Sequence, residues 1–267
     1  MAPFGIRLAD RVRFVGNPLC VGLDPMPSRM PEGETLESFC LGVIDAVQDI
    51  VPVVKPQAAY FEAAGWRGVA ALERVVAHAR DVGLVVLLDA KRGDIGSTME
   101  AYRTATVDPD GPLGADAVTL SPWLGPESLG AFLNSADRGV FVLLRTSNPG
   151  AERWQQPVAD DLAAWIAAQN EAAESWGNVG AVVGATLGSD ISKWRDALPK
   201  TWLLLPGVGT QGGSISDTRA AFDAHNLGAL VVSARDVLYP SAGRDGPDWR
   251  TAIRSRALAL SQRLAAP

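Results

Sequence analysis

Residues 83–102 constrain the fold of this chain more than any other stretch. They open with an uninterrupted apolar run at 84–88, which follows a glycine and has the length of a strand buried on both faces. The run leads directly into the charged segment DAKRGD. Because side chains alternate along a strand, Asp89 and Lys91 should point the same way. Charged groups at the carboxyl end of a buried strand are typical of active sites in parallel α/β proteins.

A turn and a helix should follow this strand. Gly93 permits the turn, and a helix is expected over 96–106, so Asp94 falls where a helix would begin. Asp94 and Thr98 are four residues apart and should share a helical face. The sequence therefore predicts that Asp89, Lys91 and Asp94 gather at the end of one strand.

The same strand-then-helix pattern recurs eight times along the chain. The expected strands are 19–25, 52–57, 84–88, 115–123, 139–151, 179–188, 201–213 and 228–240. The expected helices are 36–51, one ending near 82, 96–106, 126–136, 158–176, 192–198, 216–225 and 247–264. Eight such units predict a closed (β/α)₈ barrel, with residues 1–267 as a single catalytic domain. A doubly wound open sheet is the alternative, but it needs an edge strand, and every strand here reads as buried.

The composition excludes several classes of protein. The 267 residues are 47% hydrophobic and 20% charged, which is ordinary for a globular protein, and the net charge of −6 argues against nucleic acid or an anionic membrane as a partner. No apolar run approaches the ~20 residues of a membrane span, and the charged N-terminal segment is unlike a signal peptide. Cys20 and Cys40 form no metal or disulfide pattern, so a cytoplasmic protein is expected. With only two histidines, no metal site and no Ser-His-Asp triad is predicted.

Polar residues collect at the ends of the expected strands, and a barrel would bring them to one mouth. They are Asp24, Lys55, Asp89, Lys91, Ser121, Ser147, Asn148, the loop 206–213 and Arg235. A structural network of ion pairs along the barrel rim could explain any one of them. The whole set indicates a functional site, because charges at the ends of apolar strands are costly to bury unpaired.

The last two strands carry the features of a phosphate site. The loop PGVGTQGG follows the seventh strand, and its glycines, Gly207, Gly209 and Gly212, would let backbone N–H groups approach an anion. Arg235 follows the eighth strand and can donate two hydrogen bonds to phosphate oxygens. In barrels the loops after the last two strands commonly bind phosphate.

Six segments together resemble the orotidine 5′-phosphate decarboxylase family, and its longer bacterial (type 2) subgroup most closely. They are VGLDP, VVKPQ, LLDAKRGDI, TSNPGA, LPGVGTQGG and the arginine-containing end of the eighth strand, and they span residues 19–239. The resemblance implies conversion of orotidine 5′-monophosphate to UMP and CO₂ in pyrimidine biosynthesis, with no metal and no organic cofactor. It also implies a homodimer with active sites at the subunit interface.

The resemblance further assigns roles to individual residues. Four residues would form a charged tetrad: Lys55, Asp89, Lys91 and Asp94. Lys91 would be the proton donor to C6, the carbon of the pyrimidine ring that loses CO₂. Asp94 and Thr98 would come from the partner subunit. The expected substrate contacts are Asp24 and Lys55 to ribose, Ser147 to the pyrimidine, and Gln211, Arg235, Gly207, Gly209 and Gly212 to phosphate. Ala234 departs from the family pattern, which commonly has glycine before this arginine.

Three other functions remain open from the sequence. A metal-assisted sugar-phosphate decarboxylase or aldolase would need further carboxylates at strand ends, and Glu62 lies close to the second strand. A Schiff-base aldolase would need a lysine with a depressed pKa, whereas Lys91 lies between carboxylates. A nucleotide-binding barrel without activity would have no use for a carboxylate beside the substrate carboxylate.

Overall fold

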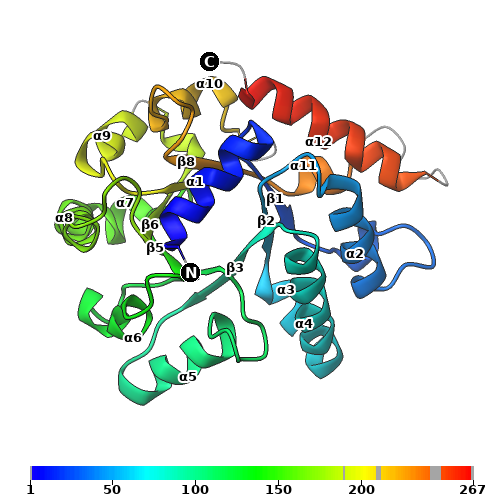
Figure 1. The fold of residues 1–267 in the computed structure, drawn as a ribbon, viewed down its shortest axis with the longest axis horizontal. Helices are drawn as coiled ribbons and strands as arrows, with labels where there is room; N and C mark the ends of the chain where they lie inside the picture. The colour runs from blue at the N-terminus through cyan, green and yellow to red at the C-terminus, as the bar shows by residue number, and fades with distance from the viewer. Residues whose placement is uncertain (1, 189, 209–211, 241–247, 266–267) are drawn as a thin grey trace.

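A closed barrel of eight parallel strands, ringed by helices, forms the centre of the computed structural model, which describes residues 2–188, 190–208, 212–240 and 248–265 (Figure 1). The strands are β1 (Leu19–Leu23), β2 (Val53–Pro56), β3 (Val85–Arg92), β4 (Ala117–Leu120), β5 (Gly139–Arg145), β6 (Val179–Val183), β7 (Leu203–Pro206) and β8 (Ala229–Ser233). They pair in sequence order, and β8 closes on β1. This confirms the predicted (β/α)₈ barrel, and no strand of it forms the edge that an open sheet requires.

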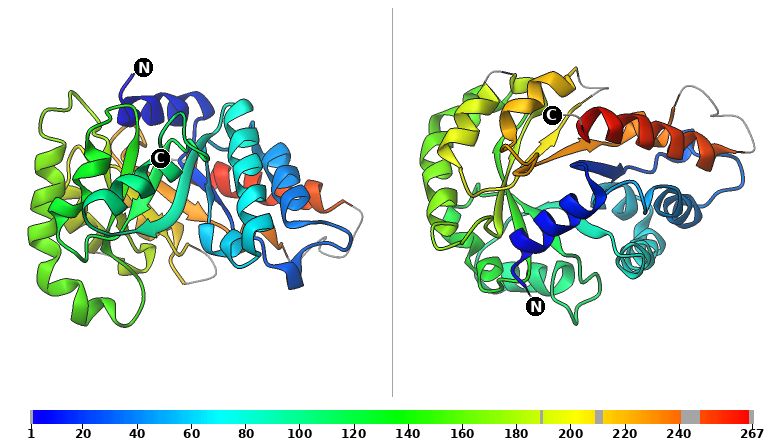
Figure 2. Two further views of the ribbon diagram at one scale, coloured as in Figure 1. Left: turned by 90° about the horizontal axis from the view of Figure 1, so that it is seen from below. Right: turned by 45° about the horizontal axis from the view of Figure 1, so that its top comes forward.

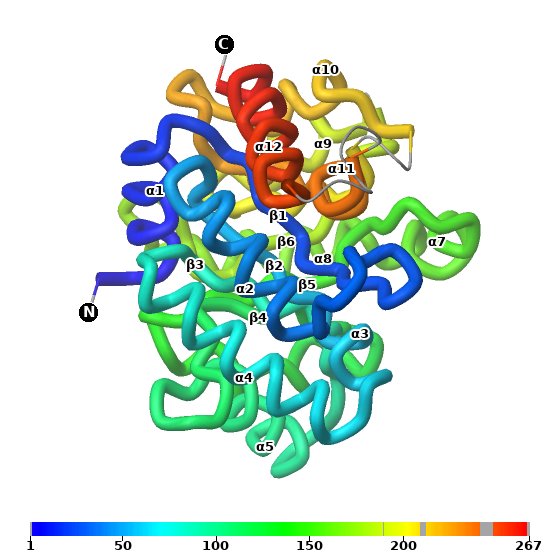
Figure 3. The backbone as a smooth tube through the Cα atoms, turned by 90° about the vertical axis from the view of Figure 1, so that its right-hand side faces the viewer, coloured from blue at the N-terminus to red at the C-terminus, as the bar shows by residue number. Residues whose placement is uncertain are grey.

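The helices cover the outside of the barrel and one of its ends. They are α1 (Phe4–Val15), α2 (Leu36–Val47), α3 (Ala58–Glu62), α4 (Gly65–Asp81), α5 (Gly96–Thr106), α6 (Gly130–Leu133), α7 (Ala151–Trp154), α8 (Ala159–Gln169), α9 (Asp190–Ala197), α10 (Ile215–Thr218), α11 (Arg235–Leu238) and α12 (Trp249–Ala265). Short 3₁₀ turns are Pro27–Arg29, Pro126–Leu129, Gln156–Val158, Ala185–Leu187 and Arg219–Ala221. Helices α2, α4 and α12 run side by side along one flank (Figure 3).

The first helix, α1, was not predicted from the sequence. It crosses one end of the barrel, as the side view in Figure 2 shows. Phe4, Leu8 and Val12 recur every four residues, and all three are buried. That period is the signature of an amphipathic helix, and it is readable in the sequence. Gly16 ends α1 in the left-handed conformation, with φ +81°, which glycine adopts without strain.

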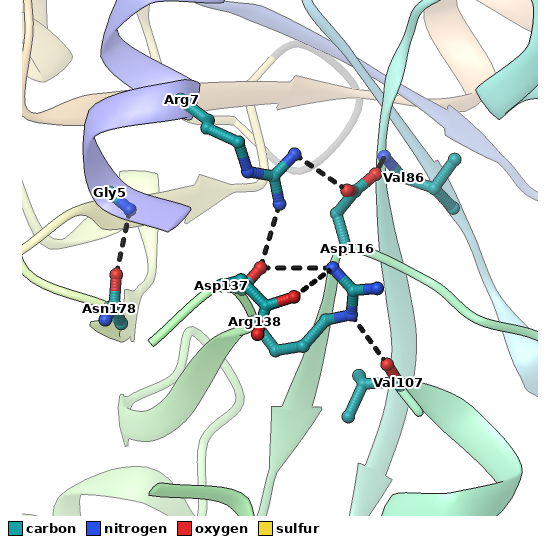
Figure 4. Close-up of polar contacts among 8 residues, drawn as sticks. All are labelled: Gly5, Arg7, Val86, Val107, Asp116, Asp137, Arg138 and Asn178. Atoms are coloured by element: carbon teal, nitrogen blue, oxygen red, sulfur yellow. Dashed lines mark hydrogen bonds and ion pairs between the residues drawn. The ribbon is translucent and has the colours of Figure 1, made fainter. Parts of the chain in front are cut away.

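The polar contacts of α1 identify which end of the barrel it closes. Arg7 pairs with Asp116 at 3.1 Å, and the Gly5 N–H donates to Asn178 at 3.0 Å (Figure 4). Asp116 immediately precedes β4, and Asn178 immediately precedes β6. Helix α1 therefore lies over the amino ends of the strands, and the carboxyl ends are left open at the opposite mouth.

Several helix boundaries differ from the prediction. The expected helix 126–136 is a 3₁₀ turn followed by the short α6, and 216–225 is α10 followed by a 3₁₀ turn. The expected helix 158–176 ends as α8 at Gln169, because the next residue, Asn170, turns its amide onto the Val179 backbone, with Nδ2 to O at 2.7 Å. Residue 247, where the last helix was expected to begin, lies outside the described residues, and α12 starts at Trp249.

Alternation along the strands separates two apolar cores. One lies between the barrel and the surrounding helices. The other fills the barrel, where inward side chains such as Val53, Leu87 and Ala117 pack beneath α1. Each inward residue is followed two positions later by another inward position. Polar residues that follow the apolar ones along these inward rows therefore lie nearer the open mouth.

Candidate active site

The site begins where the inward positions change from apolar to polar. Lys55 lies two residues after Val53, and Asp89 two residues after Leu87, so both continue the inward rows of their strands. The two side chains meet, with Lys55 Nζ 2.7 Å from Asp89 Oδ2. Strand alternation alone thus places a buried ion pair directly above the apolar filling of the barrel.

Asp89 is the hub of the site, because four side chains contact its two oxygens. Oδ1 receives Lys91 Nζ at 2.5 Å and the Thr119 hydroxyl at 2.9 Å. Oδ2 receives Lys55 Nζ at 2.7 Å and Gln57 Nε2 at 3.0 Å. Burial by itself would raise the pKa of Asp89, but Lys55 and Lys91 outweigh it and hold that pKa well below its ordinary value. Asp89 therefore stays anionic at neutral pH.

The two lysines of the site differ in access to solvent. The Lys55 side chain is 5% exposed, whereas that of Lys91 is 46% exposed. Burial would lower the pKa of Lys55, but Asp89 and Asp24 counteract it and raise the pKa above the ordinary value. Lys55 is thus a fixed buried cation, and Lys91 presents its ammonium group to the open mouth.

Asp24, just after β1, is the second carboxylate of the site. Its burial raises its pKa, against the attraction of Lys55. Its Oδ1 atom is buried and has no hydrogen-bond partner in the structure. A buried acceptor without a donor is costly unless a ligand supplies one. Asp24 is therefore placed to accept a hydrogen bond from a bound hydroxyl group.

One pocket of about 250 Å³ unites most of the predicted site residues. Those that line it are Asp24, Lys55, Asp89, Lys91, Ser147, Gly207 and Arg235. Ala234 also lines it, and its φ of −113° lies outside the left-handed region that favours glycine. The pocket walls add apolar side chains from β5 to β8, including Leu143 and Val182.

Three other predicted residues that the structure describes, Asp94, Thr98 and Gly212, do not line this pocket. Asp94 and Thr98 lie outside it, and Asp94 Oδ1 accepts a hydrogen bond from the Ile95 N–H at 2.8 Å. Helix α5 begins at Gly96, so Asp94 precedes the helix, and the prediction that it shares a helical face with Thr98 is wrong. Gly212 is exposed, with φ +91°, while Gly209 and Gln211 lie outside the described residues.

Other candidate groups are engaged elsewhere. Glu62 forms an ion pair with Arg92. Cys20 is a buried core residue. Burial raises the pKa of its thiol to about 12, so it is a poor nucleophile. Within the described residues, no three His, Cys, Asp or Glu side chains are grouped so that they could hold a metal ion. None of the described helices is both long enough and apolar enough to cross a bilayer.

Comparison with known proteins identifies the family. A model of the family described as "Orotidine 5'-phosphate decarboxylase / HUMPS family" matches residues 17–240. An orotidine 5′-phosphate decarboxylase from Roseiflexus castenholzii is 45% identical over 259 residues, 93% of each chain, and one from Rhodopirellula baltica is 38% identical over 300 residues, 99% of each chain. The crystal structure of a Streptomyces avermitilis protein, 41% identical, matches with a TM-score of 0.87 over 100% of this chain and 96% of that one. The chain belongs to the orotidine 5′-phosphate decarboxylase family.

Membership of the orotidine 5′-phosphate decarboxylase family confirms the resemblance that the sequence motifs indicated. Two residues that contact Asp89 were not assigned a role from the sequence. Gln57 follows Lys55 at the next inward position of its row, so the alternation could have indicated it. Thr119 is a hydroxyl inside the otherwise apolar strand AVTL, and only the register between β3 and β4 shows which residue it faces.

Proposed function

We propose that this chain converts orotidine 5′-monophosphate to UMP and CO₂ in pyrimidine biosynthesis, as a single catalytic domain in the cytoplasm and without a metal or organic cofactor. The observation that carries the proposal is the half-exposed Lys91 side chain, whose ammonium lies 2.5 Å from a buried carboxylate in the lining of the pocket. The names of the relatives, at 38–45% identity over nearly the whole chain, support the same substrate.

Lys91 supplies the chemistry in this proposal. Breaking the bond between C6 and the carboxyl group leaves the electron pair on C6 as CO₂ departs. A cation fixed beside C6 stabilises this developing charge more than it stabilises the substrate, which accelerates the reaction. Lys91 then transfers a proton from Nζ to C6 and regains one from solvent.

Asp89 holds the ammonium in place and acts on the substrate as well. Because Lys55 and Lys91 keep its pKa low, Asp89 is anionic while the substrate is bound. Its charge attracts the Lys91 ammonium and holds it in place. It also lies close to the substrate carboxylate in this arrangement, which disfavours the ground state and is relieved when CO₂ leaves.

The rest of the pocket binds the parts of the substrate that do not react. Asp24 and Lys55 would contact the ribose hydroxyls, and the unpartnered Oδ1 of Asp24 supports this role. Ser147 would hydrogen-bond the pyrimidine. The phosphate would be held by Arg235 and by the loop that carries Gly207, Gly209, Gln211 and Gly212. Binding energy from these distant contacts can then be used at the reacting carbon.

A homodimer with shared sites completes the proposal. Asp94 and Thr98 do not line the pocket of their own chain, and both lie around the start of α5, next to the exposed Ile95. This placement supports their action in the site of a second subunit. Asp94 of the partner subunit would then flank Lys91 on the side away from Asp89.

An absorbance assay tests the activity. Purified protein treated with EDTA should consume orotidine 5′-monophosphate at the rate of untreated protein. Loss of activity with EDTA would favour the metal-assisted alternative. Borohydride trapping of the enzyme with its substrate would instead identify a Schiff base.

Mixing two inactive variants tests the shared site. We expect Lys91→Ala and Asp94→Asn to be inactive separately. After subunit exchange, a random mixture should regain about a quarter of wild-type activity, because half of the dimers are mixed and each has one intact site. A mixture as inactive as its components, in a protein shown to exchange subunits, would place Asp94 in the site of its own chain or outside the mechanism.

A further inference from the structure

Thr119 is the one polar residue of strand β4, whose four residues AVTL are all buried. It is 1% exposed and lies two positions after Ala117, which points into the barrel. It therefore continues an inward row and lines the pocket. A buried hydroxyl group among apolar neighbours requires hydrogen-bond partners, because leaving it unpaired costs stability.

All of the hydrogen-bonding capacity of the Thr119 hydroxyl is used. It accepts from the backbone N–H groups of Ala90, at 3.0 Å, and of Lys91, at 2.9 Å. It donates to Asp89 Oδ1 at 2.9 Å. A hydroxyl group has one proton and two lone pairs, so two incoming N–H donors leave its proton to point at the carboxylate. A single side chain thus holds the backbone of Lys91 and the carboxylate that pairs with its ammonium.

The β3–β4 register shows why the backbone needs this acceptor. Leu88 pairs with Val118, and Arg92 pairs with Leu120, so three residues of β3 face Thr119 alone. Such a bulge removes the carbonyl partners that neighbouring N–H groups would have in a regular ladder. The Thr119 hydroxyl replaces these partners for both Ala90 and Lys91.

The bulge also holds Lys91 in an uncommon conformation. Its φ is +48°, in the left-handed region that residues other than glycine seldom adopt. Such a conformation persists only where the surroundings impose it. The two N–H bonds to Thr119 lie at the residues that make this turn, so they are the contacts that define the direction of the Lys91 side chain.

We propose that Thr119 is a positioning residue, which fixes the bulge and thereby aims the Lys91 ammonium at the reacting carbon while orienting Asp89 beside it. This role rests on the proposed function of Lys91. It does not require Thr119 to touch the substrate. The hydroxyl, and not the methyl group, is the part that matters.

Two variants separate the hydroxyl from the shape of the side chain. Thr119→Val keeps the shape and removes the hydroxyl, whereas Thr119→Ser keeps the hydroxyl and removes the methyl. We expect Thr119→Val to lower kcat by about 10- to 100-fold, the effect of leaving one or two buried groups unpaired, with KM changed by less than about threefold. Thr119→Ser should stay within about threefold of wild-type kcat, because its hydroxyl can make the same three bonds.

Thr201→Val is the matched control. Thr201 is fully buried and its hydroxyl accepts a hydrogen bond from Asn170 Nδ2 at 2.9 Å, but it precedes β7 at the closed end of the barrel. This variant also loses a buried hydroxyl group, so it measures the structural cost alone. We expect it to keep wild-type kcat at a temperature where it is folded.

Amide hydrogen exchange gives a readout that does not depend on turnover. The N–H groups of Ala90 and Lys91 should exchange faster in Thr119→Val and should keep their protection in Thr119→Ser. If wild-type protein released no CO₂, the proposed function would fail, and this exchange would still decide whether the Thr119 hydroxyl fixes the bulge. Wild-type kcat in Thr119→Val, equal losses in the Val and Ser variants, or unchanged exchange at both amides would each overturn the proposal.

Discussion

The two ends of the barrel use the same kinds of residue in opposite ways. At the closed end, Arg7 and the Val86 N–H occupy the two oxygens of Asp116, at 3.1 and 3.0 Å (Figure 4). At the open end, Asp89 is paired with two lysines, and the side chain of one of them, Lys91, is 46% exposed. The carboxylate of Asp116 is tied to fixed backbone and to α1, whereas that of Asp89 is tied to a cation that can reach a ligand.

Each end contains a buried side-chain atom without a hydrogen-bond partner, but the two atoms differ in their surroundings. At the closed end the atom is Arg7 Nε, which belongs to a guanidinium whose other two nitrogens bind Asp116 and the Asp137 carbonyl. At the closed end, the Trp202 indole donates to the Gly5 carbonyl at 3.2 Å, beneath an apolar filling that includes Phe4 and Phe141. At the open end, Asp24 Oδ1 is buried and unpaired. The closed end thus binds its polar side chains to other parts of the protein, whereas the open end keeps in its pocket an unpaired acceptor that a ligand can reach. Substitutions at the two ends should therefore affect different measurements.

The largest effect is expected at the open end. Lys91→Ala should reduce turnover by more than about 10⁴-fold, because both the cation and the proton donor are lost. UMP affinity and the urea midpoint should change little. Lys193→Ala is the matched control, since Lys193 is also half-exposed and pairs with a carboxylate, Asp160, on the outer surface. Substantial turnover by Lys91→Ala would remove this lysine from the mechanism.

The second-largest effect is expected at the closed end, and it should be confined to the free energy of unfolding. Phe4 is 2% exposed and packs edge-on against Phe141. Phe4→Ala should lower the free energy of unfolding by about 3–5 kcal/mol, the usual cost of such a cavity, while kcat of the folded protein stays near wild type. Phe14 on the same helix is 82% exposed, and Phe14→Ala should cost less than about 0.5 kcal/mol. A large fall in kcat for folded Phe4→Ala would show that the two ends are coupled.

The smallest effect is expected at Asp24, where stability and binding should change in opposite directions. Burial raises the pKa of Asp24, so the folded protein binds this proton more tightly than the unfolded chain, and the charged form destabilises the fold at neutral pH. Asp24→Asn should therefore be more stable than wild type at pH 7. This difference should shrink as pH falls through the folded pKa and vanish below the ordinary value of about 3.9.

Urea unfolding at several pH values would measure that trend, and UMP titration would measure the cost to binding. We expect UMP affinity of Asp24→Asn to fall by about tenfold at pH 7, the effect of losing one charged hydrogen bond. A variant that is less stable than wild type at pH 7, or that binds UMP equally well, would contradict the role given to this carboxylate.

The barrel was predictable because its signal is repeated and local. Eight apolar runs with polar ends give the strand order, and alternation within them brings Lys55 to Asp89. The N-terminal helix was not predicted although its four-residue period is visible, because Arg7 and Arg11 interrupt the apolar residues of this segment.

The details of the site depended on contacts between strands, which no single segment contains. The apolar run of the third strand ends at Leu88, and β3 continues to Arg92 through the bulge opposite Thr119. The sequence places Asp89 and Lys91 on one side by simple alternation, but the observed backbone reaches that result through a left-handed residue. Asp94 was predicted to begin a helix, but that helix begins two residues later, at Gly96. Asp94 lies instead in the turn between the end of β3 and α5.

The bulge at Lys91 has a consequence for transplanting this chemistry into other barrels. A grafted Asp-x-Lys segment would bring the two charges but not the hydroxyl that lies across the ladder, and a host with valine at that place would let the lysine relax to an ordinary strand conformation. The smallest portable unit is a pair of adjacent strands. Designers who copy the motif alone should obtain a barrel that folds and does not react.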